Sequence, residues 1–288
     1  MSAQTLKQPR ASSTKRPSGA RTRWDLSALA LLVAFVMFFP ILWMILTGFK
    51  TEQEAISIPP KLFFNLSLES LGEVFATSDY AKHFFNSVIA ALGSTALALL
   101  LAIPAAYALA FYPTKRSNST LLWILSTKMM PPVGVIIPIY LIYRDLRWLD
   151  NIFGLMLMFA VMNLPVVIWT LFAYFKELPQ EIFEAARVDG ASTWQELTML
   201  LLPLSLPAIA SSGLLAVIFS WNETFWSLNL TTSQASPLTV FVSSFKTSEG
   251  LFWAKMSAGS ALAVLPVMVL GWLAQRQLVR GLTLGAVK

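Results

Sequence analysis

The sequence predicts an all-α integral membrane protein with six transmembrane helices. Of its 288 residues, 56% are hydrophobic and 12% are charged, and the mean hydropathy is +0.64, whereas an ordinary soluble domain carries roughly 25% charged residues. A helix needs roughly 20 apolar residues to cross a hydrocarbon core of about 30 Å. Six runs of about that length are present: residues 26–48, 84–110, 120–143, 152–175, 204–228 and 256–275. We expect kinks or local irregularity in the runs that contain proline.

The segments between these runs divide the chain further. Residues 1–25 form a basic tail without apolar periodicity, which we expect to be disordered. The first run exceeds the usual 7 to 15 residues of a signal-peptide core and is interpreted as a retained span, 26–48. An external segment, 49–83, follows, with a short helix expected within 68–75. The remaining parts are a five-helix core, 84–280, which includes a long charged loop at 176–203, and a C-terminal tail, 281–288.

The distribution of basic residues predicts the orientation in the membrane. With six spans, both chain ends lie on one side. Thirteen Lys and Arg residues fall on that side, six of them in the N-terminal tail, and seven fall on the other. Because cytoplasmic segments carry the excess of Lys and Arg, we expect cytoplasmic termini and a cytoplasmic loop at 176–203. The net charge of +6 is explained by this orientation and by contact with anionic lipid, not by binding of nucleic acid.

Several kinds of chemistry lack the residues they need. The chain has no cysteine and a single histidine, His83, which we interpret as an interfacial residue. The phosphate-binding pattern G-x-x-x-x-G-K-[ST] is absent, so the chain has no visible means of hydrolysing a nucleotide. We therefore expect a non-catalytic chain that binds no metal or cofactor of its own.

The charged loop encodes a helix, a sharp turn and a second helix. Pro179 suits the first turn of a helix, and Gly190 suits the left-handed position that ends one. Ser192 and Gln195 have the spacing of a capping box for a second helix, which we expect to end at Pro203. In the first helix, Ile182, Phe183, Ala186 and Ala185 form a broad apolar side. Such a helix binds either lipid or a protein groove, and the excess of acidic residues favours the groove.

The spacing of the residues in this loop resembles the EAA loop of the membrane subunits of bacterial binding-protein-dependent ABC importers. The resemblance is carried by Glu184-Ala185-Ala186, three residues, Gly190, nine residues, Leu200, one residue and Leu202-Pro203. The family usually has isoleucine where this chain has Leu200. In the family, this loop is the coupling helix that docks into an ATPase subunit. The positions implied for ATPase coupling are Glu184, Ala185, Ala186, Asp189, Gly190, Leu202 and Pro203.

Three more stretches resemble the carbohydrate-uptake permeases of the maltose type, in particular the six-span member of the usual pair. They are residues 126–157, 219–231 and 278–288. The resemblance implies a type I importer fold in the bacterial inner membrane and a heterodimer with a second permease subunit. It also implies two cytoplasmic ATPase subunits, which bind ATP and Mg, and a periplasmic or extracellular solute-binding protein that delivers the substrate.

The resemblance further implies roles for two parts of the chain. The motif glutamate, Glu184, is expected to pair with a basic residue of the ATPase. The end of the chain is expected to reach between the ATPase subunits, which would place five residues there: Gly281, Leu282, Thr283, Leu284 and Gly285.

Polar residues inside the spans are candidates for the substrate path, because such residues are costly in lipid. Lys128 either snorkels or pairs structurally, or faces the path, and Asn163 is expected to satisfy backbone groups freed by the adjacent proline. Asn222 and Glu223 interrupt an apolar span beside Trp221. Planar hydrogen-bonding groups beside an aromatic ring suit a sugar or polyol, although membrane aromatics also serve as packing or interfacial anchors.

Two other classes of protein remain open at this point. A stand-alone secondary transporter would show an internal repeat with paired broken helices, and no such symmetry is visible. It would also leave the charged loop unexplained. An intramembrane enzyme would need a cluster of catalytic side chains, and the cytoplasmic half of the sequence offers none.

Overall fold

A computed structural model describes residues 24–76, 79–247 and 250–284 of the chain. The chain forms two units, and their described parts are residues 24–43 and, apart from the gaps just given, residues 44–284. The described part of the first unit is the beginning of helix α1 (Trp24–Thr47), which is apolar and 24 residues long. All other elements belong to the second unit, and apart from a short hairpin their regular structure is helical.

Five helices among the described residues are long and apolar enough to cross a membrane. They are α1, α4 (Tyr80–Phe111), α7 (Ile152–Phe175), the continuous helical run Thr193–Trp221, and the first 20 residues of α13 (Trp253–Leu284). These five correspond to five of the six spans expected from the sequence.

The expected third span, 120–143, is not a single helix, and the expectation of six continuous spans needs correction. The chain forms α5 (Ser117–Thr127) and α6 (Pro132–Asp145) instead, of 11 and 14 residues. Two adjacent prolines cause the break. Pro131 lacks an N–H and precedes another proline, which forces it into extended backbone at φ −64° and ψ 127°. Each of the two helices is shorter than the roughly 20 residues that a span needs.

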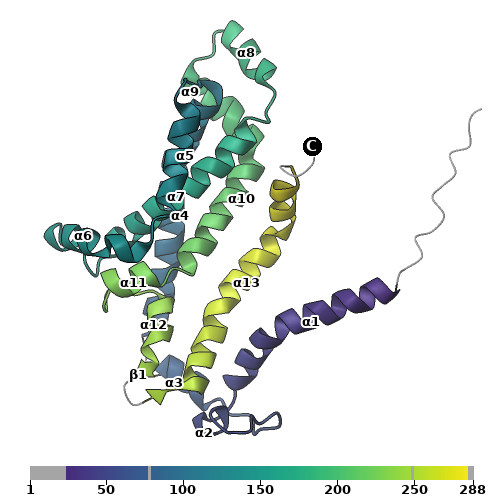
Figure 1. The fold of residues 1–288 in the computed structure, drawn as a ribbon, viewed down its shortest axis with the longest axis vertical. Helices are drawn as coiled ribbons and strands as arrows, with labels where there is room; N and C mark the ends of the chain where they lie inside the picture. The colour runs from purple at the N-terminus through teal and green to yellow at the C-terminus, as the bar shows by residue number, and fades with distance from the viewer. Residues whose placement is uncertain (1–23, 77–78, 248–249, 285–288) are drawn as a thin grey trace, which may run out of the picture. The chain divides into compact units, whose positions relative to one another are not determined.

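The core of the second unit is the packing of α4 against α7 and α10 (Leu202–Trp221), which lie side by side in Figure 1. Small residues on α4 allow the close approach, and Ala90, Ser94 and Ala98 are fully buried. Polar side chains also join the helices. The Ser94 hydroxyl lies 3.0 Å from that of Ser220 on α10.

Shorter elements gather at the end of this unit that lies opposite α8 (Gln180–Val188) (Figure 1). They are α2 (Glu52–Ala55), α3 (Glu69–Ala76), α12 (Leu238–Ser244), β1 (Lys246–Thr247) and β2 (Gly250–Leu251). Helix α11 (Phe225–Leu230) lies nearer the middle of the unit, beside α6 (Figure 1). The Glu52 carboxylate accepts the N–H groups of Ala254 and Lys255 at 3.1 and 3.0 Å and so caps α13. Lys255 also pairs with Glu73 on α3 at 2.6 Å.

Asp150, between α6 and α7, fixes the loop between α11 and α12. Its carboxylate accepts the backbone N–H groups of Thr232, Ser233, Gln234 and Ala235 at 2.9 to 3.2 Å. Burial alone would raise the pKa of this carboxyl, but the donated N–H groups outweigh that effect and hold the pKa well below 3.8. The loop is therefore held by an ionised carboxylate.

The helical run from Thr193 to Trp221 corrects a second expectation. The helix that starts after Ser192 does not end at Pro203. It passes from α9 (Thr193–Gln195) through a π-helical turn, η1 (Glu196–Leu201), directly into α10. Leu202 donates its N–H to the carbonyl of Leu197, five residues earlier. Because the wide turn already displaces the α-helical bonding pattern, a residue without an N–H is accommodated at position 203.

Asp150→Asn should loosen the loop between α11 and α12. The Asn side chain keeps one acceptor oxygen but carries no charge. We therefore expect the protection of the backbone N–H groups of residues 232–235 against hydrogen exchange to fall about tenfold, the effect of losing a charge-assisted hydrogen bond. In the wild type, the folded-state pKa is depressed, so the stabilisation is complete above the unfolded value of 3.8 and is lost as the pH falls below it. Hydrogen exchange measured by mass spectrometry, corrected for the intrinsic rate at each pH, should show constant protection from pH ~8 to about pH 5.

Asp145→Asn is the matched control, because Asp145 is an exposed acid at the end of α6 that pairs with its neighbour Arg144. Equal loss of protection in the two variants would contradict the role given to Asp150.

Candidate functional site

A sharp turn ends helix α8 where the sequence predicts it. The turn is formed by Asp189, Gly190 and Ala191, and Gly190 has φ +87°. Gly190 donates its N–H to the carbonyl of Arg187 at 3.1 Å, and Ala191 donates to that of Ala186 at 2.9 Å. This pair of bonds is the Schellman arrangement, which needs a left-handed residue and so favours glycine.

The start of the second helix also forms as expected. The Ser192 hydroxyl accepts the N–H of Gln195 at 3.4 Å, and the Gln195 side chain accepts the N–H of Ser192 at 2.8 Å. The capping box predicted from the sequence is therefore confirmed.

Helix α8 is held to the rest of the chain through its apolar side. Phe183 is 1% exposed, and its ring centroid lies 4.3 Å from that of Phe111 at the end of α4. Glu184, Ala185 and Asp189 are exposed on the outside of the loop. The surface that carries the motif glutamate is thus left accessible by the described part of this chain.

An ion pair joins α8 to the π-helical turn. The Arg187 guanidinium donates to both oxygens of Glu196, at 2.8 Å from Nε and 2.9 Å from Nη2. The hydroxyl of Tyr107, on α4, donates to the same carboxylate at 2.6 Å. The hydrogen bonds to Glu196 raise the pKa of Arg187 above its usual range, so the guanidinium stays charged.

A shallow hollow of about 310 Å³ lies beside the turn. It is lined by Ala186, Asp189, Gly190, Ala191, Gln195, Met199 and Leu200. Three of the expected coupling positions therefore share one surface with Leu200. Leu202 and Pro203 lie just beyond it, at the start of α10.

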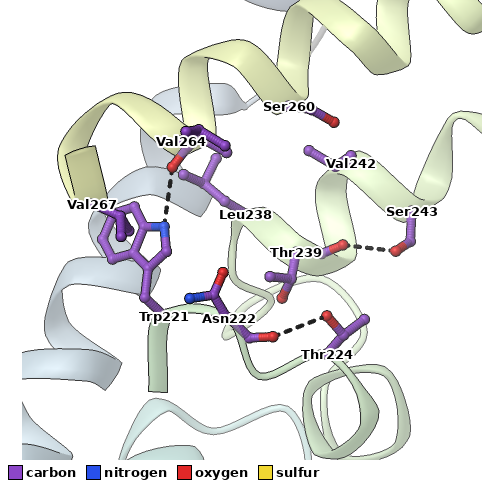
Figure 2. A pocket seen from close by; sticks show the side chains of 11 residues that line it. Trp221, Asn222, Thr224, Leu238, Thr239, Val242, Ser243, Ser260, Val264 and Val267 are labelled. Carbon is purple, nitrogen blue, oxygen red and sulfur yellow. Dashed lines mark hydrogen bonds between the residues drawn. The ribbon is translucent and has the colours of Figure 1, made fainter. Parts of the chain in front are cut away.

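At the other end of α10, the helix breaks at Asn222–Thr224, and α11 begins at Phe225. The first cavity at this break, which we call the Asn222 cavity, has a volume of about 360 Å³. Figure 2 shows its walls: Trp221 and Asn222 face the hydroxyl-bearing residues Thr239, Ser243 and Ser260 of α12 and α13. Trp221 is fixed there, because its indole N–H donates to the Ala263 carbonyl at 3.1 Å.

A second cavity of about 350 Å³, the Glu223 cavity, lies where two helix breaks meet. Lys128 comes from the break between α5 and α6, and Glu223 comes from the break between α10 and α11. Trp226 and Met162 line the same space. One cationic and one anionic side chain therefore face a single cavity.

Both charged side chains in this cavity have defined partners. Glu223 accepts the N–H of Trp226 through Oε1 at 2.9 Å and so caps α11. The Lys128 ammonium donates to the Met162 carbonyl at 3.1 Å and lies 5.6 Å from the ring centroid of Phe219. Lys128 is nevertheless exposed, and Glu223 is partly so.

Asn163 has a different role from the one expected. It is 1% exposed, and its amide donates to Ser220 at 2.9 Å and to the Ala216 carbonyl at 3.4 Å. The side chain therefore joins α7 to α10 and does not serve the backbone beside Pro165. It lines neither of the two cavities.

The structure brings the other residues expected in the substrate path together in two pairs. Trp221 and Asn222 share one cavity, and Lys128 and Glu223 share the other. Gly281 to Leu284 continue helix α13, and Gly285 lies outside the described residues. Among the residues that the structure describes, no group of three or more His, Cys, Asp or Glu side chains could hold a metal ion.

Sequence reasoning missed Glu196 and Tyr107. Glu196 stands nine positions after its ion-pair partner, across a turn, and Tyr107 comes from a helix 89 residues away from it in sequence. Neither spacing forms a local pattern. The hydroxyls of Thr239 and Ser243 were missed as well, because they reach the Asn222 cavity only through the packing of α12 against α4 and α13.

Comparison with known proteins gives the family. The sequence model of one protein family, described as the binding-protein-dependent transport system inner membrane component, matches residues 98–283 of this chain. The chain belongs to this family, which confirms the resemblance carried by its sequence. It is 35% identical over 257 residues to a probable ABC transporter permease protein, y4oR, of Sinorhizobium fredii, covering 89% of this chain and 92% of that protein.

Two further matches agree. The chain is 32% identical to the diacetylchitobiose uptake system permease protein DasC of Streptomyces coelicolor, covering 95% of this chain and 99% of the relative. The fold matches a chain of a bacterial ABC transporter involved in the import of the acidic polysaccharide alginate, with a TM-score of 0.72 and 23% identity. That match covers 91% of this chain and 99% of the other.

Proposed function

We propose that this chain is the permease subunit of an ATP-driven importer that carries a sugar, polyol or related carbohydrate across the bacterial inner membrane. Membership of the binding-protein-dependent family carries the proposal. One relative is named for diacetylchitobiose uptake and one structural neighbour for alginate import, and both of these are carbohydrates.

The subunit works as part of a larger complex in this proposal. Its partners are a second permease subunit, two cytoplasmic ATPase subunits and a periplasmic or extracellular solute-binding protein. The ATPase subunits bind ATP and Mg and carry out the hydrolysis, while this chain is non-catalytic. The family description, which names a binding protein, supports the last of these partners.

The coupling surface is the exposed side of α8 and the hollow beside it. Glu184 is exposed and offers a negative charge to a basic residue of an ATPase. Ile182 and Val188, which are 41% and 88% exposed, add an apolar surface that a protein groove can cover. The small side chains of Ala185 and Ala186 leave room for such a groove to approach. The end of α13, Gly281 to Leu284, and Gly285 are proposed to contact the same partners.

The substrate path is proposed to follow the two cavities. Irregular backbone at membrane depth is tolerated where it is buried in protein or lines a water-filled space. The breaks at Lys128–Pro131 and Asn222–Thr224 each border one of the two cavities. Hydroxyls, an amide and the Trp221 ring suit the polar edges and apolar faces of a sugar ring.

The orientation follows from the thirteen basic residues on one side against seven on the other. Helices α4 and α7 run in the same direction, because Tyr107 and Phe175 near their ends share one buried cluster and Ala90 and Leu155 near their starts share another. Helices α5 and α6 together therefore carry the chain back between them, and the number of crossings stays even. In this orientation α8 and both chain ends lie in the cytoplasm, where ATP is available. Helices α3 and α12 then face outward, toward a solute-binding protein.

Glu184→Lys should uncouple transport from ATP hydrolysis. The substitution reverses the charge offered to a basic partner, at a cost of about 2 kcal/mol or more. Since the side chain is exposed, membrane insertion should be normal. We expect substrate-stimulated ATP hydrolysis by the reconstituted complex to fall about tenfold or more.

Glu177→Lys is the matched control, since it makes the same charge change at an exposed position just before α8. Wild-type stimulation in the Glu184 variant, or equal loss in the control, would remove Glu184 from the coupling surface.

The orientation can be tested with reporters. Fused after Lys288, a reporter that is active only in the cytoplasm should be active, and one that is active only outside the cell should not. Inserted near Ser67, the two kinds of reporter should give the opposite result. An exported C-terminus would contradict the orientation and the coupling role together.

Glu223→Gln should slow transport by about tenfold, the effect of losing one charge-assisted hydrogen bond. Glutamine keeps the side-chain shape and an acceptor for the N–H of Trp226, so the cap of α11 is retained. Transport should be measured per assembled complex, with Asp145→Asn as the acid-to-amide control. An unchanged rate per complex would remove Glu223 from the substrate path.

A further inference from the structure

Glu196 is a buried carboxylate that takes no part in the exposed coupling surface. It is the first residue of η1 and is 1% exposed. Its two oxygens accept three hydrogen bonds, two from Arg187 and one from Tyr107. A charge this deeply buried is retained only with such partners, because removing it from water is costly.

The three groups come from three different elements. Arg187 is on α8, Tyr107 is on α4, and Glu196 begins the π-helical turn that leads into α10. Arg187 also lies 5.0 Å from the ring centroid of Tyr112, just after α4. A bidentate pair between a guanidinium and a carboxylate fixes orientation as well as distance, so α8 is set at a defined angle to both other elements.

The position of Glu196 along the chain connects this contact to helix α10. From Glu196, the chain runs without interruption through η1 and α10 to the break at Asn222. The π-helical turn is a local irregularity of the kind often found at functional sites. A displacement of α8 is therefore transmitted through the Glu196 carboxylate to α10, the helix that ends beside both cavities.

We propose that Glu196 is a positioning residue for energy coupling, which holds α8 against α4 and η1 so that α8 and α10 move together. This proposal rests on the docking role proposed above for α8. Glu196 itself does not touch the ATPase or the substrate and acts through Arg187 and Tyr107.

A purely structural role would have a different signature. If the carboxylate only stabilised the fold, its loss would lower the yield of assembled complex but leave the properties of each assembled complex unchanged. The geometry of α8 and the stimulation of ATP hydrolysis must therefore both be measured per assembled complex.

The geometry can be measured with spin labels, because the natural chain has no cysteine. Labels are placed on Gln180→Cys and Leu206→Cys, at exposed positions on α8 and α10, in an assembled complex in which only this chain is labelled. We expect one narrow distance distribution, the same with and without ATP. Glu196→Gln, which cannot accept all three hydrogen bonds and leaves Arg187 without its counter-charge, should broaden it.

Tyr107→Phe is the milder second variant, because it removes one hydrogen bond and keeps the ion pair. It should broaden the distribution less than Glu196→Gln does. Glu177→Gln, at an exposed site outside the contact, is the control and should match the wild type. In the same samples, the ratio of substrate-stimulated to basal ATP hydrolysis should fall several-fold in Glu196→Gln.

Two results would overturn the proposal. An unchanged distance distribution in Glu196→Gln would show that the carboxylate does not set the position of α8. A broadened distribution with wild-type stimulation would show that its position is not used in coupling. Failure of the docking role proposed for α8 can be distinguished from failure of this proposal. It would appear as wild-type stimulation of ATP hydrolysis in Glu184→Lys, whereas the distances between the labels do not depend on Glu184.

Discussion

The close packing of α4 against α7 and α10 is the constraint on which the other features depend. Small buried residues such as Ala90 and Ala98 let the helices approach, and in lipid such packing substitutes for the hydrophobic effect. Polar links between the helices, among them Asn163 to Ser220, fix the register. Because α10 is held in this way, its two ends are placed as well: the π-helical turn beside α8 at one end, and the helix break beside the cavities at the other.

This arrangement separates the two tasks of a coupled transporter along one helix. The exposed side of α8 is available to a partner, and the ion pair between Arg187 and Glu196 joins α8 to the start of the run that contains α10. At the far end, Asn222 and Glu223 face two different cavities. In the proposed function, the contact that binds a driving subunit and the side chains that meet a substrate are thus parts of one continuous helical path.

Local signals in the sequence were sufficient for the turn after α8, since Gly190, Ser192 and Gln195 act within a few residues of one another. They were insufficient where distant segments meet. The two prolines at 131 and 132 indicated irregularity, but the sequence did not show that the expected span divides into α5 and α6. Pro203 suggested an end to a helix that a π-helical turn allows to continue. The partners of Glu196 and of Asn163 depend on helix packing, which has no local pattern.

Transport by purified components tests the central claim most directly. The chain is reconstituted in proteoliposomes with its second permease, ATPase subunits and solute-binding protein, and carbohydrate uptake is followed with ATP present or absent at the ATPase side. We expect uptake only when ATP, the binding protein and this chain are all present. Uptake by this chain alone, driven by an ion gradient without ATP, would contradict the claim and indicate a secondary transporter instead.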